Sequence, residues 1–252
     1  MVEEVRKSLP YYAATYRRTW RSTVLSSFVA PVAYLVGMGF GVGSVTQPGH
    51  AVAYTSQLFP GLAVLAAVST AGAEGTYPVF ARSARSGFHS VMKYTPLSIS
   101  SIVLGQTCWI AMRAAAACCV FGIVGLACGV ASLRGAATSV LIATAAGTAA
   151  ALPMMAFSVS LRQAGALELG MRLVYAPMVL FSGALYPMHV APPAYHAAAW
   201  FNPVWHAVEI SRAVAGKADA SAATSLHAAV ITALAGGSFF LAVHCYGRRL
   251  RR

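Results

Sequence analysis

Side chains that could perform catalysis or hold a metal are present in this sequence, but their spacing assembles no recognisable reactive group. The seven histidines are scattered between His50 and His244, without an HExxH motif or a carboxylate at ligand spacing. The six acidic residues form no close pair within an apolar run, and both a GxSxG nucleophile motif and a GxxxxGK[ST] phosphate loop are absent. These patterns favour a chain that is not an enzyme, has no metal site and binds no cofactor itself.

Residues 74–98 form one of two segments whose side chains are suited to contacts rather than to catalysis. The segment interleaves aromatic residues such as Tyr77 and Phe80 with the basic residues Arg82 and Arg85. A simple connection between helices needs only a few polar residues, whereas aromatic and arginine side chains are typical of protein–protein interfaces. We interpret the segment as a contact surface for another protein; a membrane-facing amphipathic segment is the alternative.

The second segment, residues 185–216, is apolar and divided by prolines into pieces too short to cross a bilayer. Its aromatic residues, including Trp200 and Trp205, suit the headgroup level of a membrane. We expect two short re-entrant or interfacial helices within residues 190–216, with an ordinary outer loop as the alternative. Glu209 and Arg212 stand three residues apart, so a helix would bring their charges side by side.

The elements that must position these segments are transmembrane helices. The chain of 252 residues is 58% hydrophobic and 10% charged, whereas soluble domains contain about 25% charged residues. A helix needs about 20 apolar residues to cross a bilayer. The sequence therefore predicts an all-α integral membrane protein with one transmembrane domain over residues 1–252. The six predicted spans are Val24–Val45, Tyr54–Ala73, one within Ile99–Val130, Ala136–Leu161, Leu173–Met188 extended backward by a turn, and Ala222–Tyr246.

The net charge of +12 is distributed unevenly along the chain. Fifteen of the 18 Lys and Arg residues fall in alternate segments between the predicted spans. By the positive-inside rule this asymmetry predicts that both termini are cytoplasmic, and an even number of spans also requires the termini to share a side. Because the basic residues punctuate apolar runs and form no polar face, the pattern does not favour nucleic-acid binding.

Residues 1–23 are predicted to form an amphipathic helix in the membrane interface. An apolar stripe at helical spacing includes Tyr12, Tyr16 and Trp20, and the basic residues Arg17 and Arg18 flank it. Pro10 should kink this helix. A basic tail that only fixes the topology is the alternative interpretation.

Two features inside the apolar runs carry further expectations. Arg113 interrupts the run Ile99–Val130. It is expected either to snorkel at the start of a span near Ala114 or to face a pathway and meet an anionic head group. The pairs Gly37/Gly41 and Gly39/Gly43 fit the GxxxG pattern and predict close packing between helices.

The two contact segments together resemble the permease subunits of type 2 ATP-binding-cassette (ABC) exporters, the group that includes nodulation lipo-oligosaccharide and daunorubicin-type drug exporters. The resemblance extends over nearly the whole chain, and its most specific part is a proline, a histidine a few residues later, and then an acid and an arginine three apart. The matching stretches are Glu74–Tyr77, Tyr94–Ser98 with Leu104–Gln106 after it, Phe181–Pro187 and Asn202–Arg212.

The resemblance implies a half-transporter in the bacterial plasma (inner) membrane. Two permease chains, identical or related, would work with two ABC ATPase subunits, and those subunits would bind ATP and magnesium. The complex would export a lipidic, glycolipid or hydrophobic drug-like substrate from the cytoplasm or the inner leaflet, surrounded by membrane lipids. The alternatives are an intramembrane transferase, with His189, His196 or His206 as base, and a non-transporting membrane assembly subunit.

The resemblance also implies roles for particular residues. The amino-terminal helix and the loop after the second span would dock on the ATPases, and the short outer helices would line or close the exit. The interfacial helix would use Tyr12, Tyr16, Arg17, Arg18 and Trp20. The ATPase-coupling residues would be Glu74, Tyr77, Phe80, Arg82, Arg85, Phe88, His89 and Met92. The outer re-entrant gate would consist of Tyr195, Trp200, Pro203, Trp205, His206, Glu209 and Arg212.

Overall fold

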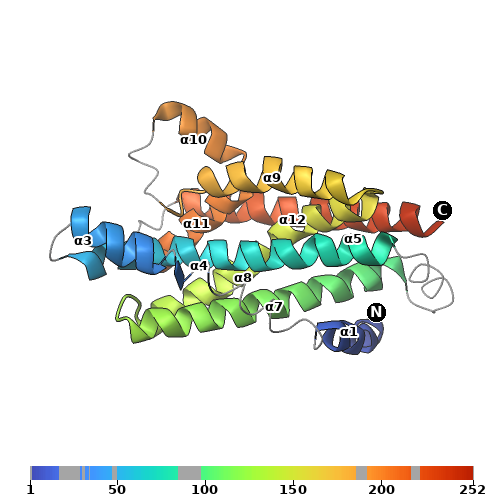
Figure 1. Cartoon of the computed structure of the whole chain (residues 1–252), viewed down its shortest axis with the longest axis horizontal. Helices are drawn as coiled ribbons and strands as arrows, with labels where there is room; N and C mark the ends of the chain where they lie inside the picture. Colours follow the sequence, from blue (N-terminus) through green and yellow to red (C-terminus); the bar gives the residue numbers. More distant parts are fainter. Residues whose placement is uncertain are drawn as a thin grey trace.

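The described part of the chain folds into an elongated bundle of helices, and both termini lie at the same end of it (Figure 1). The computed structural model describes residues 2–16, 29, 32–33, 35–46, 50–84, 98–185, 192–216 and 222–251. Every regular element within these ranges is a helix. The structure therefore agrees with the predicted all-α membrane class.

Four long stretches of helix are apolar enough to cross a bilayer, among the residues that the structure describes. They are α4 (Ala51–Gly75) together with α5 (Tyr77–Ala84), α7 (Ile99–Ala127), α8 (Leu133–Ser160) and α12 (Ala222–Arg251). The core lies mainly between α4, α7 and α8, and large fully buried side chains such as Leu62, Ile110 and Phe121 fill it.

Serine caps begin α7 and α8. The Ser98 hydroxyl accepts a hydrogen bond from the Ser101 amide, and the Ser132 hydroxyl accepts one from the Gly135 amide at 3.1 Å. Each cap satisfies an amide that lacks an intrahelical partner. Between the two helices Gly129 adopts φ +68°, so the turn uses a conformation that favours glycine.

Shorter helices complete the described fold. At the amino-terminal side these are α1 (Val2–Tyr16), the π-helix η1 (Leu35–Val42) and α3 (Gly43–Thr46). Later in the chain they are α9 (Ala164–Leu180), α10 (Pro193–Trp200) and α11 (Pro203–Val214). The short helices α10 and α11 lie where the prolines predicted two short pieces.

Two predicted spans have different bounds in the structure. Of the run Leu173–Met188, residues 173–180 lie in α9, which begins at Ala164 and ends at Leu180, and residues 186–188 lie outside the described residues. The helix begins before the apolar run and carries the exposed charged residues Glu168 and Arg172 in that earlier part. It ends before Gly183, which adopts φ +67°. Much of the run Val24–Val45 lies outside the described residues. The helices that the structure describes in this part of the chain are η1 and, directly after it, α3.

Close contact between α4 and α8 depends on Gly147. A Cβ atom at this position would lie 2.8 Å from both the carbonyl carbon and the oxygen of Ala67. By contrast, a Cβ at Gly37 would meet nothing within 4 Å, and one at Gly41 would meet only the Val36 carbonyl at 3.7 Å. Among the described residues, no other helix therefore lies against Gly37 or Gly41, so the predicted GxxxG packing is not made by this pair, while the Gly39/Gly43 pair stays a prediction.

Gly147→Ala is expected to destabilise the protein by about 1–3 kcal/mol, since two backbones must separate to admit one methyl group. The matched control is Gly236→Ala in α12, where an added Cβ meets nothing within 4 Å. The control should be neutral or slightly stabilising because alanine favours helix. Thermal unfolding of both variants in the same detergent measures the effect. Equal melting temperatures for the two would contradict the packing argument.

Candidate functional site

The short helix α5 is the candidate contact element, and it lies at the end of the bundle that carries both termini (Figure 1). It is separated from α4 by Thr76, whose hydroxyl donates to the Gly72 carbonyl at 2.9 Å. Val79, Phe80 and Ser83 are buried, whereas the Tyr77 side chain is 67% exposed. One face of α5 therefore anchors it to the bundle and Tyr77 remains available for contact. Arg85, Phe88, His89 and Met92 lie outside the described residues.

Arg82 joins α5 to two other helices. Its guanidinium group donates a hydrogen bond from Nη2 to Oε1 of Gln106 in α7. The same group lies 5.2 Å from the centre of the Tyr12 ring in α1, within the range of a cation–π contact. A displacement of α5 would therefore act on α7 and α1 through one side chain.

Glu74 and Arg113 form a buried ion pair between α4 and α7. Arg113 Nε lies 3.2 Å from Glu74 Oε1, and both side chains are largely withdrawn from the surface. The guanidinium carbon of Arg113 also lies 3.9 Å from the centre of the Tyr16 ring. Neither expectation for Arg113 describes this geometry, because the arginine is neutralised by a carboxylate of its own chain. The partner is 39 residues away, a separation to which helical spacing gives no guide.

Helix α1 packs on α7 through aromatic rings. Tyr12 is 3% exposed, and its ring stacks on Trp109 with the centroids 6.3 Å apart. Tyr16 makes an edge contact with the same tryptophan at 5.8 Å. The predicted helix is thus present, and its aromatic stripe faces the bundle. Arg17, Arg18 and Trp20 lie outside the described residues.

Polar contacts also hold α1 and α12 in place. Glu4 accepts hydrogen bonds from the amide and hydroxyl of Ser98, at 3.4 and 3.3 Å. Hydrogen bonds from the Ser101 side chain and the Ser98 backbone lower the pKa of Glu4 below its usual value, so its charge is retained at neutral pH. From α12, Arg249 Nη2 donates to the Ser83 carbonyl of α5 at 3.4 Å. Side chains of α1, α7 and α12 thus contact α5.

At the opposite end of the bundle, α11 is fixed by its polar residues. The Asn202 side chain caps α11 by accepting from the Val204 amide at 3.0 Å, and its Nδ2 donates to the Met178 carbonyl of α9 at 2.7 Å. The predicted pairing of Glu209 and Arg212 is confirmed, with Oε1 and Nη1 3.4 Å apart. Arg212 Nη2 also donates to the Gly183 carbonyl at 2.6 Å. This arginine therefore ties α11 to the turn after α9.

A cluster of aromatic and histidine side chains joins α10, α11 and α12. The Nδ1 atoms of His206 and His227 lie 2.6 Å apart, and His206 Nε2 lies 3.0 Å from the Trp200 carbonyl. Trp205 is buried beside both histidines. Of the predicted gate residues, Trp205, His206 and Arg212 are buried, Pro203 and Glu209 are partly buried, and Tyr195 and Trp200 are exposed. Sequence reasoning missed His227 because it follows His206 by 21 residues on another helix.

In the part of the chain that the structure describes, no three His, Cys, Asp or Glu side chains are close enough together to hold a metal ion. What the fold offers is a bundle of apolar helices with a short anchored helix at one end and a braced pair of short helices at the other. This arrangement defines a multi-pass membrane protein.

Comparison with known proteins identifies the family. Residues 11–215 match the ABC-2 type transporter family, and the chain belongs to it. It is 30% identical to Nodulation protein J of Bradyrhizobium diazoefficiens over 253 residues, covering 96% of this chain and 94% of that protein. Nodulation protein J of Rhizobium meliloti is 25% identical over 246 residues, covering 95% and 94%. No solved structure matches the chain.

Further relatives extend the same similarity. Nodulation protein J of Rhizobium leguminosarum bv. trifolii is 28% identical over 210 residues, covering 81% of this chain and 80% of that protein. The resemblance to nodulation-type exporter permeases is therefore confirmed. The chain is a membrane transport subunit of an ABC exporter, and membership of this family implies an ABC ATPase partner.

Proposed function

We propose that this chain moves a lipidic, glycolipid or hydrophobic drug-like substrate out of the cytoplasm or inner leaflet, driven by ATP hydrolysed on separate subunits. The observation that carries the proposal is the attachment of α5: a short helix with an exposed tyrosine is joined to α7, α1 and α12 by buried and polar contacts. Such an element can transmit a push from a partner into the bundle because packed helices shift as units.

The coupling residues divide into two groups in this proposal. Tyr77 touches the ATPase, since its side chain is exposed. Glu74, Phe80 and Arg82 transmit the movement within the permease, because their partners lie inside the chain. Arg85, Phe88, His89 and Met92 are proposed to complete the docking surface.

At the other end of the bundle, α10 and α11 form the outer re-entrant gate in this proposal. The chain reaches these helices through the turn after α9, and Ser211 Oγ donates to the Pro60 carbonyl of α4 at 3.3 Å. A movement of α4 at its proline could therefore be passed directly to α11. Both termini would then be cytoplasmic, because they share the end of the bundle with α5 (Figure 1).

Assembly with a second permease copy, or with a related chain, is part of the same proposal. Large apolar side chains are exposed on α9 and α12, including Leu173 at 66% and Phe240 at 74%. Surfaces of this kind must be covered by lipid or by another protein. The alternative of a transferase with His206 as base has little support, because both of its ring nitrogens are engaged within the chain.

Tyr77→Ala is expected to reduce the stimulation of ATP hydrolysis by the permease at least tenfold, because it removes an exposed aromatic anchor. The chain is co-expressed with its ATPase and purified in lipid, and vanadate-sensitive hydrolysis is measured. The matched control is Leu141→Ala, which removes a similarly exposed apolar side chain from α8, outside both proposed contact regions. If no ATPase co-purifies, or if both variants behave alike, the proposed coupling role of α5 is wrong.

A further inference from the structure

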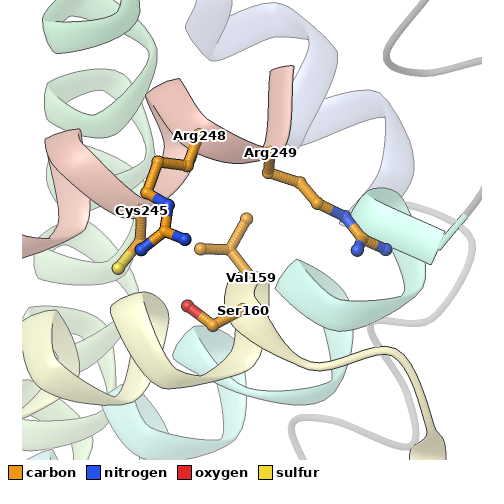
Figure 2. Close-up of a pocket in the computed structure, with 5 residues that line it drawn as sticks. All are labelled: Val159, Ser160, Cys245, Arg248 and Arg249. Carbon is orange, nitrogen blue, oxygen red and sulfur yellow. The ribbon is translucent and has the colours of Figure 1, made fainter. Parts of the chain in front are cut away.

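A cavity with a basic wall lies between the carboxyl-terminal ends of α8 and α12. Its volume is about 160 Å³, and it is lined by Val159, Ser160, Cys245, Arg248 and Arg249 (Figure 2). A cavity of ~150 Å³ is large enough for benzene, so this one has room for a phosphate group. None of the lining residues belongs to the Glu74–Arg113 pair or to α10 and α11.

Among the residues that the structure describes, no acidic side chain pairs with the arginines of this cavity. Within the described residues, no carboxylate lies within 4 Å of Arg248 or Arg249. Figure 2 shows the Arg248 guanidinium directed toward Ser160, whereas the Arg249 side chain extends elsewhere, and its Nη2 donates to the Ser83 carbonyl. The Ser160 hydroxyl donates to the Ala156 carbonyl at 2.8 Å. A cavity lined by two arginines and a polar side chain favours the binding of an anion. The planar guanidinium group can donate two parallel hydrogen bonds to the oxygens of a phosphate.

The surface of α12 indicates where such an anion would come from. Leu241, His244 and Arg248 recur at spacings of three and four, so they share one face of the helix, and all three are exposed. Phe240 extends the apolar part of this surface. The distance from Leu241 to Arg248 along the axis is about 10 Å, or two turns. This apolar strip, Phe240 and Leu241, gives way to His244 and Arg248, an order that suits acyl chains below a charged head group.

We propose that Arg248 binds the phosphate group of an anionic membrane phospholipid, and that Arg249, which lines the same cavity, adds positive charge to the site. Ser160 and Cys245 form the walls of the site, and the acyl chains lie along the exposed face of α12. A soluble phosphate compound could present the same chemistry, but it would not use the apolar strip. Because Arg249 also contacts α5, the lipid would sit beside the coupling helix.

Lipid binding to the purified full-length chain in detergent tests the proposal by native mass spectrometry, without any ATPase. Phosphatidylglycerol is compared with phosphatidylcholine and with inorganic phosphate. The unaltered chain should prefer phosphatidylglycerol to phosphatidylcholine at least tenfold, and inorganic phosphate should compete only weakly. Arg248→Gln/Arg249→Gln should reduce the affinity for phosphatidylglycerol at least tenfold, because two basic contacts near the membrane surface are lost.

The matched control is Arg162→Gln/Arg172→Gln, which removes the same charge from two exposed arginines outside the cavity lining. It should retain affinity within about twofold. An equal loss in both double variants would overturn the site in favour of a diffuse basic surface. Arg248→Lys/Arg249→Lys should bind at intermediate strength, because lysine keeps the charge but not the planar fork. If inorganic phosphate bound the site as tightly as phosphatidylglycerol does, the proposal that the ligand is a lipid would be wrong.

A second measurement keeps both arginines in place. In a variant with Cys245 as the sole cysteine, phosphatidylglycerol should slow maleimide labelling of the thiol several-fold, because the head group occupies the cavity that Cys245 lines. Phosphatidylcholine should have a smaller effect. Equal labelling rates in the two lipids would contradict the proposed occupancy. Both measurements report on lipid alone, so a failure here leaves the coupling proposal for α5 unaffected.

Discussion

Arg113→Met is expected to destabilise the protein by about 3–5 kcal/mol, because it leaves the Glu74 carboxylate buried without its partner. Breaking one side of a buried pair costs more than removing the pair, since the remaining charge must be desolvated alone. The double variant Glu74→Gln/Arg113→Met should therefore recover most of the lost stability. Thermal unfolding of the detergent-purified protein measures both effects.

The control for this prediction is Arg134→Met, which removes an exposed arginine near the start of α8. Its effect should remain within about 0.5 kcal/mol. The internal ion pair would lose its assigned role if Arg113→Met were as stable as this control, or if the double variant were no better than the single one. The export activity of the double variant then distinguishes a role in folding from a role in transmission. If the double variant is stable but does not export, the ion pair takes part in coupling ATP hydrolysis to transport.

Arg82→Ala is expected to lower substrate export at least tenfold while leaving appreciable ATP hydrolysis on the partner. The substitution removes the contacts of α5 with Gln106 and with the Tyr12 ring, but it leaves Tyr77 and the buried Phe80 in place. Docking should therefore persist while movement is no longer passed efficiently to α7 and α1. The measurement is the ratio of substrate exported to ATP hydrolysed in reconstituted vesicles.

Arg82→Lys provides the conservative comparison. Lysine retains the charge but not the planar guanidinium group that reaches Gln106 and lies over Tyr12, so partial coupling is expected. Arg134→Ala serves as the control for the loss of a positive charge at an exposed position. Parallel losses of hydrolysis and export in Arg82→Ala would argue for a docking role instead of a transmission role.

Local patterns determined much of what the sequence predicted. Apolar runs predicted an all-helical membrane protein, prolines predicted two short helices near the carboxyl-terminal third, and the spacing of Glu209 and Arg212 predicted their ion pair. These predictions succeed because each depends on residues within one helix or one short segment, where the period of the helix places the side chains. The resemblance to type 2 exporter permeases depends on equally local motifs, and the family comparison confirms it.

Predictions that required knowledge of a neighbouring helix were less successful. The sequence predicts Arg113 at the membrane boundary or in a pathway, yet its charge is neutralised by Glu74 of α4. The GxxxG pattern of the first apolar run predicts close helix packing, yet two backbones approach closely at Gly147 of α8 and Ala67 of α4 instead. The end of α9 was placed too far along the chain because hydropathy alone does not register the turn at Gly183.

The sequence by itself determined the membrane class, the helical composition and the family, because hydropathy, periodicity and short motifs are properties of consecutive residues. Only the tertiary structure decided which residues meet: Arg113 with Glu74, His206 with His227, Arg82 with Tyr12, and the two arginines of α12 with the end of α8. The physical reason is that each helix fixes its own side-chain spacing, whereas its rotation and depth relative to another helix depend on packing across the bundle.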